Sequence, residues 1–139
     1  MRENADSIQK QNIHIRIIFP APYSLVGSFE QAFGPYPFPL YADPDRKAFR
    51  GMGHDTANKA KLLAKAAGGI LSGRVKDFIP KDPSKKKVTL QSMKTTDVYI
   101  QGGTWLFNEN NEDIWTHLDD SPENHASISQ IINVINNRF

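Results

Sequence analysis

Five side chains that could bind a metal ion or transfer a proton lie within nine residues near the C-terminus. They are His117, Asp119, Asp120, Glu123 and His125. Imidazole and carboxylate groups are common ligands of divalent metals. The pattern nevertheless places His117 on an expected strand and His125 in the first turn of an expected helix. Acids before a helix already serve capping and the helix dipole. We therefore expect an exposed polar hairpin edge here and no metal site.

Two glycine pairs suggest phosphate binding, because glycine-rich loops cradle phosphates through backbone N–H groups. The pairs are Gly51-x-Gly53 and Gly68-Gly69. Neither completes GxGxxG or GxxxxGK[ST], and neither follows a convincing central strand. Helix termination explains both pairs better, so we expect no nucleotide cofactor.

The aromatic residues Trp105, Phe107 and Trp115 could form a binding surface. Strand alternation makes Trp105 and Phe107 neighbours on one face, which favours packing as their role.

Cysteine is absent from the whole sequence. This absence excludes disulfides, thiolate metal ligands and every mechanism with a cysteine nucleophile or redox thiol. No Ser-His-Asp order or acid pair stands out either. From the residues alone we assign no catalytic residue and no cofactor.

Length and composition fit one ordinary globular domain of 139 residues, with 39% apolar and 23% charged residues. The polar N-terminal stretch MRENADSIQKQN lacks the apolar core of a secretory signal, and no apolar run is long enough to span a membrane. The expected location is the cytosol.

Charge is distributed unevenly along the chain. Residues 46–94 carry a net charge of +10 and residues 95–139 carry −6, although the total is only +2. The densest basic stretch, Arg74 to Lys87, could attract nucleic acid or anionic lipid. It offers no stacking platform for bases, so a solvated loop is the favoured interpretation and nucleic acid is an unlikely partner.

Apolar periodicity and capping signals predict alternating strands and helices in the first half of the chain. The expected elements are a strand at Ile13–Phe19, a helix at Ser24–Phe33 stopped by Gly34-Pro35, an edge strand at Phe38–Tyr41, a helix with Asp43 as N-cap and Pro44 at its first position that ends at Gly51 or Gly53, and a helix capped by Asp55 or Thr56. Strands followed by helices indicate an α/β fold.

The second half contains one clear hairpin and one clear helix. TWLF, the turn-rich NENNE and DIWTHL predict a β-hairpin, and Ser121 followed by Pro122 predicts the start of a closing helix. Its apolar face would contain Ile128, Ile131, Ile132, Ile135 and Phe139. Residues 73–101 stay open, with Val88–Leu90 as a candidate short strand.

The order of these features resembles the peroxiredoxin-like branch of the AhpC/TSA antioxidant family. The most specific segments are FPLYADP from Phe38 and Gly102-Gly103-Thr104 leading into a hairpin strand. His117-Leu118-Asp119 stands where the family often has His-Arg-Asp, and Asn124-His125 stands where Asp-His is common. The resemblance covers the chain from about Ile13 and implies a thioredoxin-like fold.

The resemblance also implies a missing segment. In this family a strand and a helix precede the part matched by Ile13–Phe19, and the redox cysteine lies at their junction. Asn4–Gln11 resembles the tail of that helix. We therefore expect an incomplete, N-terminally truncated thioredoxin-like domain over residues 1–139, with the first strand and helix missing. We expect Ile13–Phe19, Thr104–Phe107 and Asp113–Leu118 to share one sheet.

Two functions follow as expectations. The first is a peroxiredoxin-like protein, either a fragment or a diverged relative, that is catalytically silent because it has no thiol. The alternative is a non-enzymatic protein-binding module on the same scaffold. Any inherited ligand surface would lie where Gly103-Thr104 meets Phe38-Pro39, unless Gly102-Gly103 serves only to interrupt structure before a strand. Exposed strand edges make a protein partner or self-association the expected form of contact.

Overall fold

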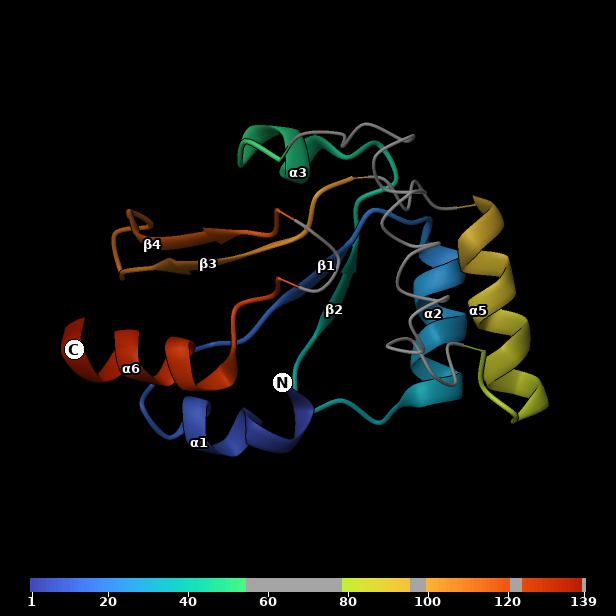
Figure 1. Ribbon diagram of the computed structural model, residues 1–139, viewed down its shortest axis with the longest axis horizontal. Helices are drawn as coiled ribbons and strands as arrows, with labels where there is room; N and C mark the ends of the chain where they lie inside the picture. The colour runs from blue at the N-terminus through green and yellow to red at the C-terminus, as the bar shows by residue number, and fades with distance from the viewer. Residues whose placement is uncertain (55–78, 96–99, 121–123, 139) are drawn as a thin grey trace. The chain divides into compact units, whose positions relative to one another are not determined.

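The computed structural model describes residues 1–54, 79–95, 100–120 and 124–138 (Figure 1). The chain divides into two compact units. One unit contains Met1–Ile15 together with Gln101–Phe139, and the other contains Arg16–Ile100. The helix expected to begin at Asp55 or Thr56 lies outside the described residues.

The unit of residues 16–100 contains a short parallel sheet. Strand β1 (Ile17–Phe19) pairs with β2 (Leu40–Ala42), with Ile17 opposite Leu40 and Phe19 opposite Ala42. Flanking bonds run from the Ile17 N–H to the Pro39 carbonyl and from the Asp43 N–H to the Phe19 carbonyl. Pro39 and Pro44 have no N–H to donate, so they limit the ladder to this length. The strand expected over Ile13–Phe19 is therefore correct in place and shorter in extent.

Helix α2 (Tyr23–Phe33) confirms the helix expected over residues 24–33. Its residues Leu25 and Val26 are buried with Ala21 and Val88 in one apolar cluster. Phe29 lies between Phe19 and Phe33, at ring-centroid distances of 5.2 and 4.8 Å. The helix ends at Gly34, where an added Cβ would collide with the carbonyl oxygen of Glu30.

Helix α3 (Lys47–Gly51) begins later than expected, and Arg46 is its N-cap residue, so the prediction of Asp43 at that position was wrong. Pro44 is not in its first turn. The carboxylate of Asp43 nevertheless accepts the backbone N–H groups of Lys47 and Ala48, both at 2.9 Å, and of Phe49 at 3.3 Å. Asp43 thus satisfies three N–H donors that have no partner within the helix. The helix ends at Gly51, as the sequence predicts.

Helix α5 (Pro83–Thr95) replaces the short strand suggested for Val88–Leu90, so that suggestion was wrong. The carboxylate of Asp82 accepts the Lys85 N–H at 3.0 Å, and Pro83 occupies the first helical position. Val88 is buried against α2 because the helix turns it inward. The Lys85 ammonium lies over the Phe33 ring, 5.7 Å from its centroid.

The other unit combines the two ends of the chain. The 3₁₀ turn η1 (Arg2–Asn4) and helix α1 (Ala5–Gln9) come first, as expected for a helical tail at residues 4–11. Strands β3 (Gly103–Phe107) and β4 (Asp113–Leu118) form the predicted antiparallel hairpin, with an irregularity at Leu106/Phe107. Helix α6 (Ile128–Arg138) follows. Ile8 and Ile135 are almost fully buried in this unit.

The strands do not share one sheet, contrary to expectation. The described strands pair as two separate two-stranded sheets, β1 with β2 and β3 with β4. A single sheet would need a strand between Ile13–Phe19 and Thr104–Phe107, and the residues before Ile13 form helical turns instead. Within the described strands, each one therefore has a strand partner on one side only.

Among the described residues, no helix is long and apolar enough to cross a bilayer.

Candidate functional site

Asp119 is the centre of a polar cluster just after the hairpin. It directly follows β4, and its N–H donates to the Gly102 carbonyl at 3.0 Å. This bond extends the pairing of Gly103 with Leu118 by one step. The residue is only 8% exposed. A carboxylate held at such depth is stable only when it is well paired, because burial penalises an ionised group.

The first partner of this carboxylate is His125. Its Nδ1 atom lies 2.5 Å from Oδ2 of Asp119. A carboxylate only accepts hydrogen bonds, so Nδ1 carries the proton and donates it. When the ring is neutral, its Nε2 atom is then a proton acceptor. The imidazole is 68% exposed, so this acceptor is open to solvent.

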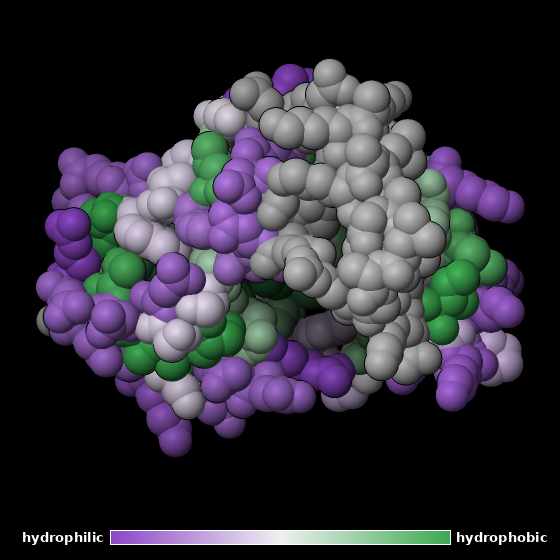
Figure 2. Space-filling model, in the orientation of Figure 1, coloured by the Kyte–Doolittle hydropathy of each residue, from purple (hydrophilic) through white to green (hydrophobic). Residues whose placement is uncertain are grey.

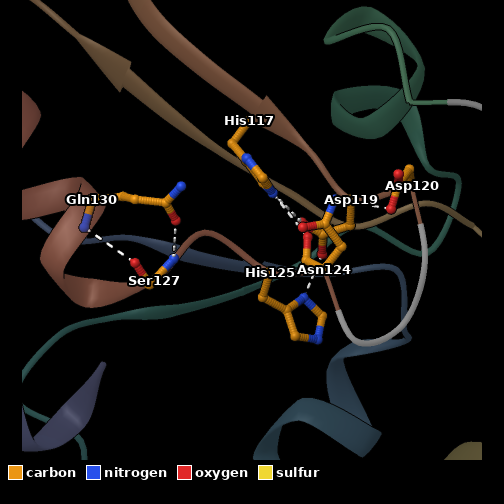
Figure 3. A network of polar contacts seen from close by, with 7 residues as sticks. All are labelled: His117, Asp119, Asp120, Asn124, His125, Ser127 and Gln130. Atoms are coloured by element: carbon orange, nitrogen blue, oxygen red, sulfur yellow. Dashed lines mark hydrogen bonds and ion pairs between the residues drawn. The ribbon is translucent and has the colours of Figure 1, made fainter.

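His117 approaches the same carboxylate from β4. Its Nε2 atom donates to the Asn124 carbonyl at 2.8 Å and lies 3.7 Å from Oδ1 of Asp119. Oδ1 is buried and makes no hydrogen bond within the described part of the chain. The His117 ring stacks beside Trp115, with centroids 6.2 Å apart. Figure 3 shows His117 pointing toward Asn124 and Asp119, and His125 meeting Asp119 from the other side.

The segment after the cluster begins α6 with a reciprocal cap. The Ser127 N–H donates to Oε1 of Gln130 at 2.8 Å, and the Gln130 N–H donates to Oγ of Ser127 at 3.2 Å. This is the capping-box arrangement, so Ser127 is the N-cap. The expected start at Ser121 is therefore wrong. Residues 124–127 are not helical, and the Asn124 amide instead donates to Asp120 at 2.8 Å.

Gly102 provides the space that the Asp119 carboxylate occupies. A Cβ atom on Gly102 would lie 2.6 Å from Oδ2 of Asp119, closer than real contacts allow. Of the Gly102-Gly103 pair, the first glycine is therefore required by a close approach. The sequence marks the pair, but nothing local in it reveals that a side chain beyond the second hairpin strand fills this space.

The four residues expected to bind a ligand lie in two places. Gly103 and Thr104 begin β3, where Thr104 pairs with His117 in the hairpin register. Phe38 is 7% exposed and its ring lies 5.8 Å from that of Tyr36, while Pro39 accepts the first bond of β1. The two pairs belong to different units of the chain. Their meeting at one surface therefore stays a prediction.

The other sequence candidates have clear surroundings. Trp105 and Phe107 stack on one face of the hairpin, with ring centroids 6.1 Å apart, as expected. Gly51 ends a helix and Gly53 adopts a positive φ of 77°, which favours glycine. Gly68-Gly69 and Glu123 lie outside the described residues. Within the described ranges, no group of three or more histidines and acids could hold a metal ion.

The cluster can therefore hold and move protons. Asp119 orients one exposed imidazole, and both histidines have a defined donor atom. Imidazole and carboxylate groups supply no electrons for reducing a substrate, and the chain has no thiol. The cluster brings together His117, Asp119 and His125, which the sequence singled out as one group. The sequence also marked Gly102 and Asn124, but it did not predict that either contacts this group.

Comparison with models of protein families places most of the chain in one family. A family model described as AhpC/TSA antioxidant enzyme matches residues 1–121. The match includes the N-terminal helix, β3, β4 and Asp119, and it stops before Asn124, His125 and α6. No curated protein and no solved structure matches the chain.

Proposed function

The chain belongs to the AhpC/TSA antioxidant enzyme family, and on that premise we propose that these 139 residues form a catalytically silent, thioredoxin-like relative of thiol-dependent peroxidases. One observation carries the proposal: the sequence contains no cysteine. Thiol-dependent peroxide reduction begins when a thiolate sulfur attacks a peroxide oxygen. The O–O bond breaks and the sulfur becomes a sulfenic acid. No side chain of this chain can take that role and be restored by a thiol.

The chemistry of the cluster of His117, Asp119 and His125 supports the same conclusion. In a peroxidase an imidazole can assist proton transfer to the leaving oxygen, but the electrons come from sulfur. Asp119 and His125 can thus supply the proton transfer of such a reaction but not its electrons. We propose that they serve the structure of the hairpin end in this chain.

An activity assay tests this proposal. The purified chain is mixed with hydrogen peroxide and either dithiothreitol or a thioredoxin system, with a metal chelator present throughout. The expected rate equals that of buffer, and a cysteine-containing thiol peroxidase at the same concentration serves as the positive control. Turnover by this chain that survives chelation and scales with its concentration would overturn the proposal.

Two versions of the proposal differ in what precedes Met1 in the gene. Mapping the 5′ end of the transcript separates them. An in-frame upstream segment that encodes a strand and a cysteine at a helix start would make these residues part of a longer antioxidant protein. A transcript without such a segment would favour a diverged, non-enzymatic protein.

The exposed face of the small parallel sheet favours a binding role as the second candidate function. Ile18 and Tyr41 lie opposite each other in the β1–β2 register and are 37% and 46% exposed. Apolar side chains exposed on the face of a sheet are suited to contact with another chain. We propose a protein partner or a second copy of this chain for this face, in the cytosol.

A further inference from the structure

Helix α6 presents two different faces within its unit. Ile131 and Ile135 are buried, and they form the apolar face that the sequence predicts. A second face, at spacings of three and four residues, contains amides and one cation: Gln130, Asn133, Asn137 and Arg138. In Figure 2, green apolar patches are interspersed with purple polar atoms over the part of the molecule that contains the hairpin and α6.

A hollow of about 310 Å³ lies along this second face. It is lined by Trp115 of β4 and by Gln130, Asn133, Val134, Asn137 and Arg138 of α6. Four of the six lining side chains are exposed, so the hollow is open along its length. Its volume is at the lower limit for small-molecule pockets, which enclose most of their ligand. An open hollow of this volume suits a short segment of an extended chain better than an enclosed small molecule.

The amides in this hollow have unused hydrogen-bonding capacity. Asn133 and Asn137 are exposed, and their side chains make no hydrogen bond within the described part of the chain. A primary amide carries an acceptor oxygen beside a donor NH₂ group. A peptide unit offers the complementary pair, one N–H and one C=O. Two free amides side by side are therefore suited to backbone recognition.

The spacing of these amides matches an extended chain. Residues four apart on a helix rise by about 6 Å, and residues two apart on a strand advance by about 6.6 Å. Asn133 and Asn137 can therefore pair with alternate peptide units of one extended segment. Gln130 is not part of this pair, because its Oε1 atom already accepts the Ser127 N–H. From this match we propose that the hollow binds a short extended peptide by its backbone.

The other side chains that line the hollow define the preferred peptide. Trp115 and Val134 provide an apolar surface, which suits an apolar side chain of the peptide. Arg138 lies in the last turn of α6 and is exposed, with no ion pair in the described ranges. A guanidinium binds a carboxylate through two parallel hydrogen bonds. The occupant is therefore a peptide with an apolar residue near its end and a free C-terminal carboxylate.

Nuclear magnetic resonance titration of the ¹⁵N-labelled chain tests this proposal. The probe is an N-acetylated hexapeptide of alternating serine and leucine with a free C-terminal carboxylate. The expected result is a set of amide shifts at Trp115 and along residues 130–138. The same peptide with N-methylated backbone units tests backbone recognition, and its C-terminal amide form tests the carboxylate.

Three variants assign the contacts. Asn133→Ala with Asn137→Ala is expected to weaken binding by about tenfold, because two hydrogen-bonding amides are lost. Arg138→Gln is expected to abolish the difference between the acid and amide forms of the probe. Asn136→Ala is the matched control, since Asn136 is also exposed on α6 but does not line the hollow. It is expected to leave affinity within about twofold.

Equal binding by the double variant and the parent chain would overturn the proposal. So would equal binding of the N-methylated probe, or shifts confined to residues outside the hollow. The titration is independent of the proposed loss of peroxidase activity. A chain that turned over peroxide and bound the peptide would contradict the proposed function alone.

Discussion

A Cβ atom on Gly102 would lie 2.6 Å from Oδ2 of Asp119, the same oxygen that accepts the hydrogen bond of His125. The residue before β3, Gly102, and the residue after β4, Asp119, are thus in close contact. The carboxylate takes the volume that any other residue would need for its side chain. This relationship makes Gly102 a structural requirement of the cluster.

Replacing this glycine tests the relationship. Gly102→Ala is expected to lower the free energy of unfolding by about 1–3 kcal/mol, because the alanine methyl group must displace the buried carboxylate. Both tryptophans lie in the hairpin. Urea unfolding followed by tryptophan fluorescence therefore reports on the affected unit.

The control is Gly27→Ala in the interior of α2, where no atom of the described residues outside the helix's own nearby backbone lies within 4 Å of the added Cβ. Alanine is expected to raise the stability of that helix by about 0.5–1 kcal/mol, measured by circular dichroism because both tryptophans lie in the other unit. If both substitutions had the same effect, the close approach at Gly102 would not be the cause.

The Asp119–His125 pair is suited to a double-mutant cycle. The unfolding free energies of Asp119→Ala, His125→Ala and the double variant are expected to give a coupling of about 1 kcal/mol. The exposure of His125 keeps this value modest, because solvent competes for the imidazole. His14 is the control partner: it is exposed, belongs to the same unit and makes no hydrogen bond within the described residues. Its cycle with Asp119 is expected to be additive, and coupling of equal size in both cycles would refute a specific pair.

The long-range cap of α3 gives a third prediction. Asp43→Ala removes the acceptor of three backbone N–H groups, and it is expected to lower stability by about 1–2 kcal/mol. Hydrogen exchange at the amides of Lys47 and Ala48 should accelerate. Asp45→Ala is the control, because the Asp45 carboxylate is 70% exposed and makes only an exposed 3.7 Å ion pair with Lys47. Its expected effect is within about 0.5 kcal/mol.

Self-association is expected to involve the exposed face of the β1–β2 sheet. Size-exclusion chromatography with light scattering over a concentration series should show an increase in mass for the parent chain. Ile18→Lys or Tyr41→Lys should shift the equilibrium toward the monomer, because a buried interface disfavours an unpaired charge. Tyr23→Lys is the control, since Tyr23 is 75% exposed and lies outside this sheet. A sharp monomer at every concentration would rule out this face as an interface between copies.

Elements defined by local signals were predictable from the sequence. The helix at α2 and the hairpin follow from apolar periodicity and from clustered turn residues. Helix α5 was also predictable in principle, because Asp82-Pro83 repeats the Asp-Pro signal that was recognised at Asp43-Pro44. Four lysines and weak amphipathicity obscured it. The start of α6 was misplaced because Ser121-Pro122 and Ser127 with Gln130 are competing helix-start signals.

Features that depend on distant residues were not predictable in this way. Asp119 was singled out as a polar residue near a hairpin, but its burial depends on Gly102 and on the path of residues 124–127. Likewise, the pairing of strands into two sheets depends on which partner strand reaches each edge. The local sequence therefore does not determine the burial of Asp119 or the pairing of the strands.

The unit formed by residues 1–15 and 101–139 is interrupted in sequence by the whole of the other unit. During synthesis, α1 leaves the ribosome before residues 16–100, and the hairpin and α6 of its unit leave after them. Residues 16–100 can begin to pack while α1 still lacks the rest of its unit. The burial of Ile8 within its own unit must therefore wait until the hairpin and α6 have been synthesised, and until then its apolar side chain is open to chaperones.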